Sequence, residues 1–90
     1  MQRYLIRVYG RVQGVGFRYF TERLALKHHV TGTVQNVNDY VEVTAQGEGR
    51  DLEAFVQAVI KGASPASSVT HHHIESLDVE PQLGKFKVLG

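Results

Sequence analysis

The chain has 90 residues, of which 42 % are apolar and 21 % charged, and a net charge of +1 with its histidines neutral. This length and composition predict one globular domain over residues 1–90, and the small net charge excludes strong long-range attraction to nucleic acid or an anionic membrane. The absence of cysteine excludes disulfides, thiolate metal sites and a cysteine nucleophile. Because no apolar run resembles a signal peptide or a membrane-spanning helix, we expect a cytoplasmic protein.

The first half of the chain is predicted to form a strand, a loop, a helix and a hairpin. Alternating apolar residues indicate a strand over residues 3–9, and three glycines make residues 10–16 a loop. A helix over about 17–28 follows, with an apolar face formed by Phe17, Phe20, Thr21 and Leu24. Residues 30–36 and 40–46 are predicted strands, joined by a turn at Val37-Asn38-Asp39.

The second half is predicted to add one helix and one or two strands. The helix is indicated by a regular apolar stripe and ends at Gly62; the stripe is Leu52, Phe55, Val56, Val59 and Ile60. A loop over 62–68, a strand over about 70–79 and a short last strand over 85–89 follow. The βαββαβ order predicts an α+β, ferredoxin-like sandwich, in which two helices cover one face of an antiparallel sheet. That order alone indicates no function.

The predicted topology brings three segments to one edge of the sheet. A strand–helix–strand crossover returns parallel to its start, so the first two strands end at the same edge. The Gly10–Gly16 loop, the start of the first helix and Asn36 all lie there. We therefore look for the functional residues at this edge.

The segment Gly10-Arg11-Val12-Gln13-Gly14-Val15-Gly16-Phe17-Arg18 has the composition of an anion site. Its glycines let the backbone turn several N–H groups toward one point, and the helix start adds a positive dipole. Arg18 in the first helical turn can hold two phosphate oxygens at once. The same residues also fit an ordinary turn followed by a solvated arginine, and both interpretations stay open on these residues alone.

Asn36 is the second candidate. Its strand parity matches Val34, which should face the helices, so its amide could donate to a phosphate and accept from a water. An asparagine that merely starts a hairpin turn is the alternative. Two familiar phosphate motifs are absent: there is no Gly-Lys-Ser/Thr, and the third glycine of a dinucleotide fingerprint would fall at Tyr19.

At this point a resemblance can be stated. Gly10 to Arg18 resembles the first signature of the acylphosphatase family at essentially every position. Gly32-Thr33-Val34-Gln35-Asn36, followed by Val41, Val43 and Gly47, resembles the second signature. The element order and the length of 90 residues also resemble the family along the whole chain.

This resemblance implies the ferredoxin-like fold and the hydrolysis of small acyl phosphates to a carboxylate and inorganic phosphate, without metal or other cofactor. It implies that Arg18 binds the phosphoryl group and that Asn36 orients the attacking water. The main-chain N–H groups of Val12, Gln13, Gly14, Val15 and Gly16 would form the phosphate cradle. Nothing in the sequence requires more than a monomer, or a nucleic-acid or membrane partner. The physiological substrate is not readable from it.

Two residues depart from the family pattern. Thr33 stands where the second signature usually has an aromatic residue, and Tyr40 where the hairpin usually has a glycine. We expect Thr33 to change the pocket wall or local packing, and Tyr40 to shift the turn that aims Asn36. The alternative function is a phosphate-binding or regulatory domain that has lost turnover through these two changes.

Two further groups of residues suggest other chemistry. His71 and His73 would share one face of a strand and could bind a divalent metal, but no cysteine or suitably spaced carboxylate completes a site. Exposed imidazoles are the preferred interpretation, with any core-facing histidine hydrogen-bonded. The tyrosines could stack on RNA bases, since RNA-recognition modules share this element order, but the third strand lacks their aromatic signature.

Overall fold

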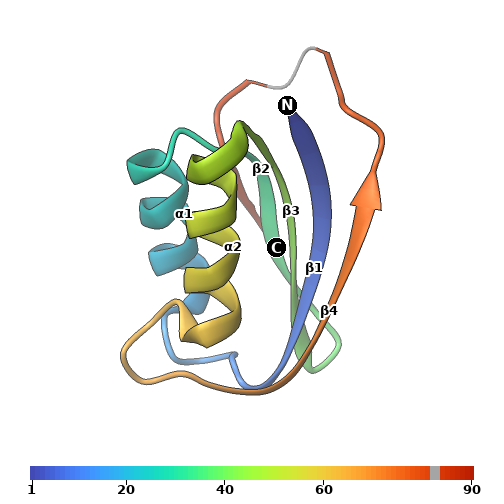
Figure 1. The fold of residues 1–90 in the computed structure, drawn as a ribbon. Coiled ribbons are helices and arrows are strands. Elements are labelled where there is room, and N and C mark those ends of the chain that lie inside the picture. The colour runs from blue at the N-terminus through green and yellow to red at the C-terminus, as the bar shows by residue number, and fades with distance from the viewer. Residues whose placement is uncertain (82–83) are drawn as a thin grey trace.

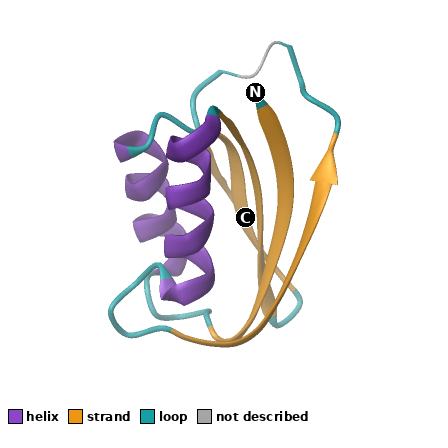
Figure 2. Ribbon diagram, in the orientation of Figure 1, coloured by secondary structure: helices purple, strands orange, loops and turns teal. Residues whose placement is uncertain are grey.

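The fold is a two-layer sandwich, described for residues 1–81 and 84–90 in a computed structural model. Two helices pack on one face of the sheet and leave its other face uncovered (Figures 1 and 2). Within the described residues the elements are β1 (Gln2–Arg11), α1 (Phe17–Lys27), β2 (Thr31–Val37), β3 (Tyr40–Gly47), α2 (Gly49–Gly62), β4 (Ser68–Leu77) and β5 (Lys87–Leu89). The predicted α+β, ferredoxin-like arrangement is confirmed, and the strand bounds differ from the predicted ones by one or two residues.

The sheet has the strand order β4-β1-β3-β2-β5. The first four strands in this order pair antiparallel, as predicted, whereas β5 pairs parallel with β2 and makes the sheet mixed. This difference follows from the path of the chain. After β4 the chain crosses to the far edge of the sheet and reverses its direction, so β5 runs with β2 (Figure 1).

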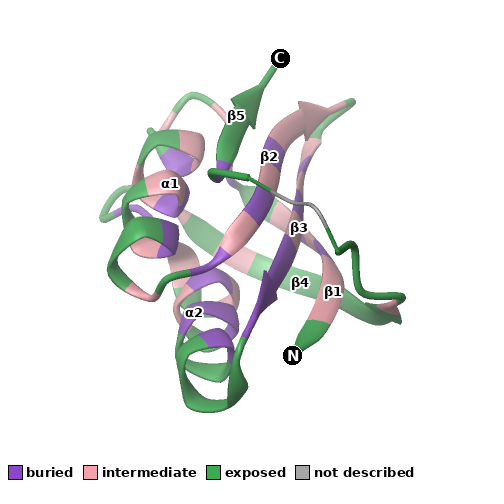
Figure 3. Cartoon of the chain, turned by 90° about the horizontal axis from the view of Figure 1, so that it is seen from above, coloured by how far each residue is buried: buried purple, intermediate pink, exposed green. Residues whose placement is uncertain are grey.

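The core lies between the helices and the sheet (Figure 3). Alternation along the central strands directs every second side chain toward the helices. These buried sheet residues are Ile6, Val8, Val34, Val41, Val43 and Ala45. The helices contribute the buried residues Phe17, Thr21, Ala25, Leu52, Phe55, Val56 and Val59. Asn36 shares the face of Val34, as its parity predicts.

Gly32 permits a close approach of β2 to β3. Its φ is 140°, and a Cβ added there would stand 1.8 Å from the main-chain oxygen of Thr44. A side chain at this position would therefore push β2, the strand that carries Asn36, away from β3.

The connection from β4 to β5 is tied to the uncovered face of the sheet. The side chain of Gln46, 5 % exposed, donates to the Glu80 carbonyl at 2.8 Å and accepts from the Glu80 N–H at 2.7 Å. Arg3 Nη1 donates to the carbonyl of Asp78 at 3.2 Å. Farther along, Phe86 is buried with its ring 6.0 Å from that of Phe55. These contacts anchor the chain immediately before β5.

None of the helices in the described part of the chain is long and apolar enough to cross a membrane.

Candidate active site

A pocket of about 350 Å³ opens at the edge of the sheet where β1 and β2 both end. Its lining includes Gln13, Gly14, Gly16, Arg18, Asn36 and Val88. The structure thus brings together the loop, the start of α1 and Asn36, the three segments that the topology predicts to meet. Val88, from β5, is an addition that the sequence did not indicate.

The loop between β1 and α1 has the backbone shape that an anion cradle requires. Gly14 and Gly16 have φ of 73° and 77°, in the left-handed region that glycine adopts without strain. Gly16 directly precedes α1, whose N-terminus has no side-chain cap and no acidic residue in its first turn. The dipole and the free N–H groups at this helix end are therefore not neutralised by a carboxylate in the first turn. Glu22, one turn after Arg18 on α1, also lines the pocket and was not predicted from the sequence.

The main-chain N–H groups of the predicted cradle residues differ in whether they already donate a hydrogen bond within the protein. The N–H of Val12 donates to the Gly10 carbonyl at 3.1 Å, whereas among the described residues no protein group accepts from the N–H groups of residues 13–16. The side chain of Val12 is 1 % exposed in the core, and that of Val15 packs against the core. The main-chain donors available to an anion are thus those of residues 13–16.

Arg18 lies in the first turn of α1 and lines the pocket. Its Nη1 donates to the Leu89 carbonyl of β5 at 3.5 Å, which is long for a hydrogen bond. No ion pair joins it to a carboxylate among the described residues. Arg18 is therefore placed at the pocket by a weak contact that an anion can replace at small cost.

Asn36 lines the same pocket from the last part of β2. Its main chain is held in register opposite Val41 of β3. Within the described part of the chain its side-chain amide has no hydrogen-bond partner, so its two N–H donors and its carbonyl acceptor are available to a ligand or a water.

The side chain of Gln13 points away from the cradle and joins it to the β2–β3 turn. Its Nε2 donates to two main-chain oxygens, that of Asn38 at 3.0 Å and that of Tyr40 at 2.9 Å. Asn38 has a left-handed backbone, with φ of 51°. The sequence predicts a role only for the main chain of Gln13, because no sequence pattern indicates which groups its side-chain amide contacts.

Both departures from the family pattern lie on the uncovered face. Thr33 pairs with Thr44 of β3 through their hydroxyl groups at 2.8 Å, so it changes local packing and does not line the pocket. The ring of Tyr40 lies 5.0 Å from that of Tyr9, with the guanidinium of Arg7 over it at 5.8 Å. A hydrogen bond to Glu42, its largest influence, raises the pKa of Arg7.

The histidines lie on β4, at one edge of the sheet. His71 and His73 share the uncovered face, as predicted; the ring of His71 is 5.4 Å from Tyr9, and His73 Nε2 is 3.0 Å from a Glu75 oxygen. His72 pairs with Val8 and so faces the helix side, but it is exposed there, and among residues 1–81 and 84–90 its side chain has no hydrogen-bond partner of the kind that we expected. Among the described residues, no three His, Asp or Glu side chains are grouped to hold a metal.

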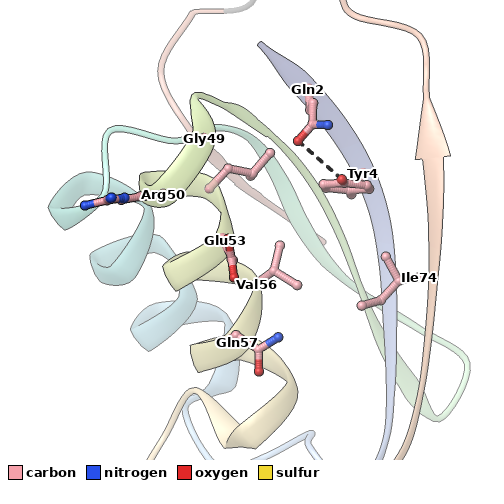
Figure 4. A pocket seen from close by; sticks show the side chains of 9 residues that line it. Gln2, Tyr4, Gly49, Arg50, Glu53, Val56, Gln57 and Ile74 are labelled. Atoms are coloured by element: carbon pink, nitrogen blue, oxygen red, sulfur yellow. Dashed lines mark hydrogen bonds between the residues drawn. The ribbon is translucent and has the colours of Figure 1, made fainter.

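A second hollow, of about 500 Å³, lies between α2 and the strands β1 and β4 (Figure 4). Leu52, Val56 and Ile74 provide its apolar surface, and the Tyr4 hydroxyl donates to Gln2 Oε1 at 3.3 Å. None of the residues predicted for the site lines it. Ile74, on the wall formed by β4, is 37 % exposed in this hollow.

Comparison with known proteins agrees with this geometry. The sequence model of the acylphosphatase family matches residues 4–88. The chain belongs to the acylphosphatase family. An acylphosphatase of Staphylococcus aureus (strain Newman) is 57 % identical over 82 residues, which cover 91 % of this chain and 92 % of that protein.

Solved structures resemble the fold closely. The acylphosphatase of Bacillus subtilis is 41 % identical, with a TM-score of 0.92 and full coverage of both chains. Full-length HypF, in a phosphate- and nucleotide-bound form, is 30 % identical with a TM-score of 0.90; the match covers 99 % of this chain but 12 % of HypF. This fold therefore also occurs as a small part of a longer protein.

Proposed function

We propose that the chain hydrolyses the carboxyl–phosphate bond of small acyl phosphates, with Arg18 binding the phosphoryl group and Asn36 orienting the attacking water. The observation that supports the proposal is that Gly14, Gly16, Arg18 and Asn36 line one pocket. Among the described residues, no protein group accepts from the N–H groups of residues 13–16. Membership of the acylphosphatase family supports the same reaction.

The proposed reaction is one in-line displacement. The water oxygen, held by the Asn36 amide, forms a bond to phosphorus while the bond from phosphorus to the carboxylate oxygen breaks. The carboxylate leaves with the electron pair, and the proton of the water passes to a phosphate oxygen. A carboxylate of low pKa is a good leaving group, so the reaction needs no general acid.

The protein contributes position and charge. Phosphoryl transfer requires mainly alignment and stabilisation of the charge on the equatorial oxygens. In the proposed site the loop N–H groups, the dipole of α1 and the guanidinium of Arg18 supply that stabilisation. These groups supply positive charge without a metal ion, and the proposed mechanism uses none.

We also propose that the protein acts as a monomer in the cytoplasm, on free small molecules and not on nucleic acid or membranes. Its net charge of +1 and its lack of cysteine support this setting.

The test is the hydrolysis of benzoyl phosphate in EDTA by the wild type, Asn36→Ala and Arg18→Ala. Wild-type turnover should be fast, and Asn36→Ala should lose about 100-fold or more in kcat, by comparison with oxyanion-hole donors. Gln35→Ala is the matched control, because Gln35 is an amide on the same strand that bonds Glu42 on the uncovered face. It should retain wild-type turnover.

The opposite result has a clear meaning. If the wild type does not hydrolyse benzoyl phosphate, but inorganic phosphate raises its Tm and fails to do so in Arg18→Ala, the chain is a phosphate-binding domain without turnover.

A further inference from the structure

The sheet joins the two halves of the proposed site only indirectly, through β3. β1 leads into the cradle and β2 carries Asn36, but β3 lies between these strands in the order β4-β1-β3-β2-β5. The pairing of β1 with β3 ends at Val8 and Val41, before the cradle begins. Val41 also pairs with Asn36, so the ladder fixes Asn36 relative to Val8, but the β1–β3 pairing does not extend past Val8 and leaves a gap between the β2–β3 turn and the cradle.

Gln13 spans this gap. Its Nε2 donates to the carbonyl groups of Asn38 and Tyr40 at 3.0 and 2.9 Å, both good hydrogen-bond distances. Among the described residues, these are the hydrogen bonds recorded between the cradle and the β2–β3 turn. Both protons of the amide nitrogen are used, one for each carbonyl.

Both ends of this connection are fixed. On the cradle side, Gln13 follows Val12, whose side chain is 1 % exposed in the core. On the hairpin side, Val37 pairs with Tyr40 and Asn36 pairs with Val41, so the turn and Asn36 move as one unit. A shift of the turn would therefore be transmitted directly to the Asn36 amide.

We propose that Gln13 is a positioning residue for the hydrolytic water: its side-chain amide clamps the β2–β3 turn to the phosphate cradle and thereby aims Asn36 at the phosphorus. This inference rests on the proposed function. The clamp uses the side chain of Gln13, whereas the cradle uses its main-chain N–H, so the two roles separate on mutation. The chain has Tyr40 where the family usually has glycine, and its main-chain oxygen is one of the two that the clamp holds.

The experiment compares Gln13→Leu, which removes the donors but keeps most of the volume, with Gln13→Lys, whose ammonium can again donate to both carbonyl groups. Gln57→Leu is the matched control, because Gln57 is exposed on α2 and lines the other hollow (Figure 4). For each variant we would measure kcat and KM for benzoyl phosphate, the Kd of inorganic phosphate by calorimetry, and Tm.

The expected result is a loss in turnover without a loss in binding. Gln13→Leu should lower kcat about tenfold, because a misplacement of about 1 Å can cost about 100-fold and the loss of the clamp should shift Asn36 by less than that. The Kd of inorganic phosphate should change less than about threefold, since the main-chain donors and Arg18 remain. Gln13→Lys should recover most of the lost kcat, and Gln57→Leu should equal the wild type.

A double-mutant cycle then identifies the residue through which Gln13 acts. In an Asn36→Ala background, Gln13→Leu should cost less than about twofold, because the group that it positions is already absent. In an Arg18→Ala background it should still cost its full tenfold or so, since that interaction is independent.

Several outcomes would overturn the inference while leaving the proposed function intact. These are a folded Gln13→Leu with wild-type kcat, an equal loss of kcat on the Asn36→Ala background, or a Gln13→Lys no better than Gln13→Leu. A wild type that does not hydrolyse benzoyl phosphate would instead refute the proposed function, and the clamp with it.

Discussion

Arg18→Lys is the sharpest test of how the proposed site holds phosphate. A guanidinium can donate two parallel hydrogen bonds to phosphate oxygens, whereas an ammonium on a flexible stem acts as a point charge. In the structure Arg18 gives up only one long contact, of 3.5 Å to the Leu89 carbonyl, when it turns to an anion. Breaking this contact costs little, so almost all of the free energy of the new hydrogen bonds from Arg18 contributes to anion binding.

The magnitude follows from the number of bonds. A hydrogen bond to a charged group contributes about 1.5–3 kcal/mol. Arg18→Lys should lose one of two such bonds, which corresponds to about a 10- to 150-fold decrease in kcat/KM. Arg18→Ala loses both bonds and should fall further.

The assay is kcat/KM for benzoyl phosphate together with the Kd of inorganic phosphate. Arg23→Lys is the control on the same helix, because Arg23 bonds the Tyr19 hydroxyl at 2.9 Å and does not line the pocket. A value of kcat/KM for Arg18→Lys within about threefold of the wild type would refute the two-bond reasoning.

Three further predictions concern stability and are measured by thermal or urea unfolding. Gly32→Ala should cost more than about 3 kcal/mol, because the new Cβ would stand 1.8 Å from the Thr44 oxygen; a Tm close to the wild type would show that β2 and β3 can separate freely. Phe86→Ala should cost about 3–5 kcal/mol, since Phe86 is 6 % exposed and packs on Phe55; a much smaller loss would mean that β5 docks without this anchor. Thr21→Val should raise stability by about 1 kcal/mol, or Tm by about 4–8 °C, because the fully buried Thr21 hydroxyl has no hydrogen-bond partner; a lower Tm would reveal one.

The sequence was sufficient to predict the elements and the three segments that meet at the candidate pocket. Alternation in residues 3–9 and 40–46 and the 3.6-residue stripe of α2 depend only on which face is buried, and the structure has these elements within one or two residues at the strand ends. The meeting of the loop with Asn36 followed from the handedness of one crossover. These features are determined by local pattern and general topology.

The remaining features depend on contacts between distant segments. The parallel pairing of β5 requires the chain to cross the sheet after β4. Gln46 holds this crossing through its hydrogen bonds to Glu80, which is 34 residues away in the sequence. Val88 therefore entered the pocket without a sequence signal. The face on which Thr33 lies could have been predicted from the sequence. Thr33 is next to Val34 on the same strand, so the two side chains point to opposite faces, and Thr33 lies on the face opposite the pocket.

The use of main-chain donors in the proposed cradle has a consequence for how such a site tolerates mutation. A substitution can delete a side-chain ligand, but every residue except proline keeps its N–H. The cradle is therefore vulnerable only through its shape, which depends on the left-handed Gly14 and Gly16. The side chains of the residues just before Gly14 are then free for structural roles: Val12 fills the core, and Gln13 holds the hairpin. One short segment can thus evolve its fold contacts and its ligand contacts almost independently.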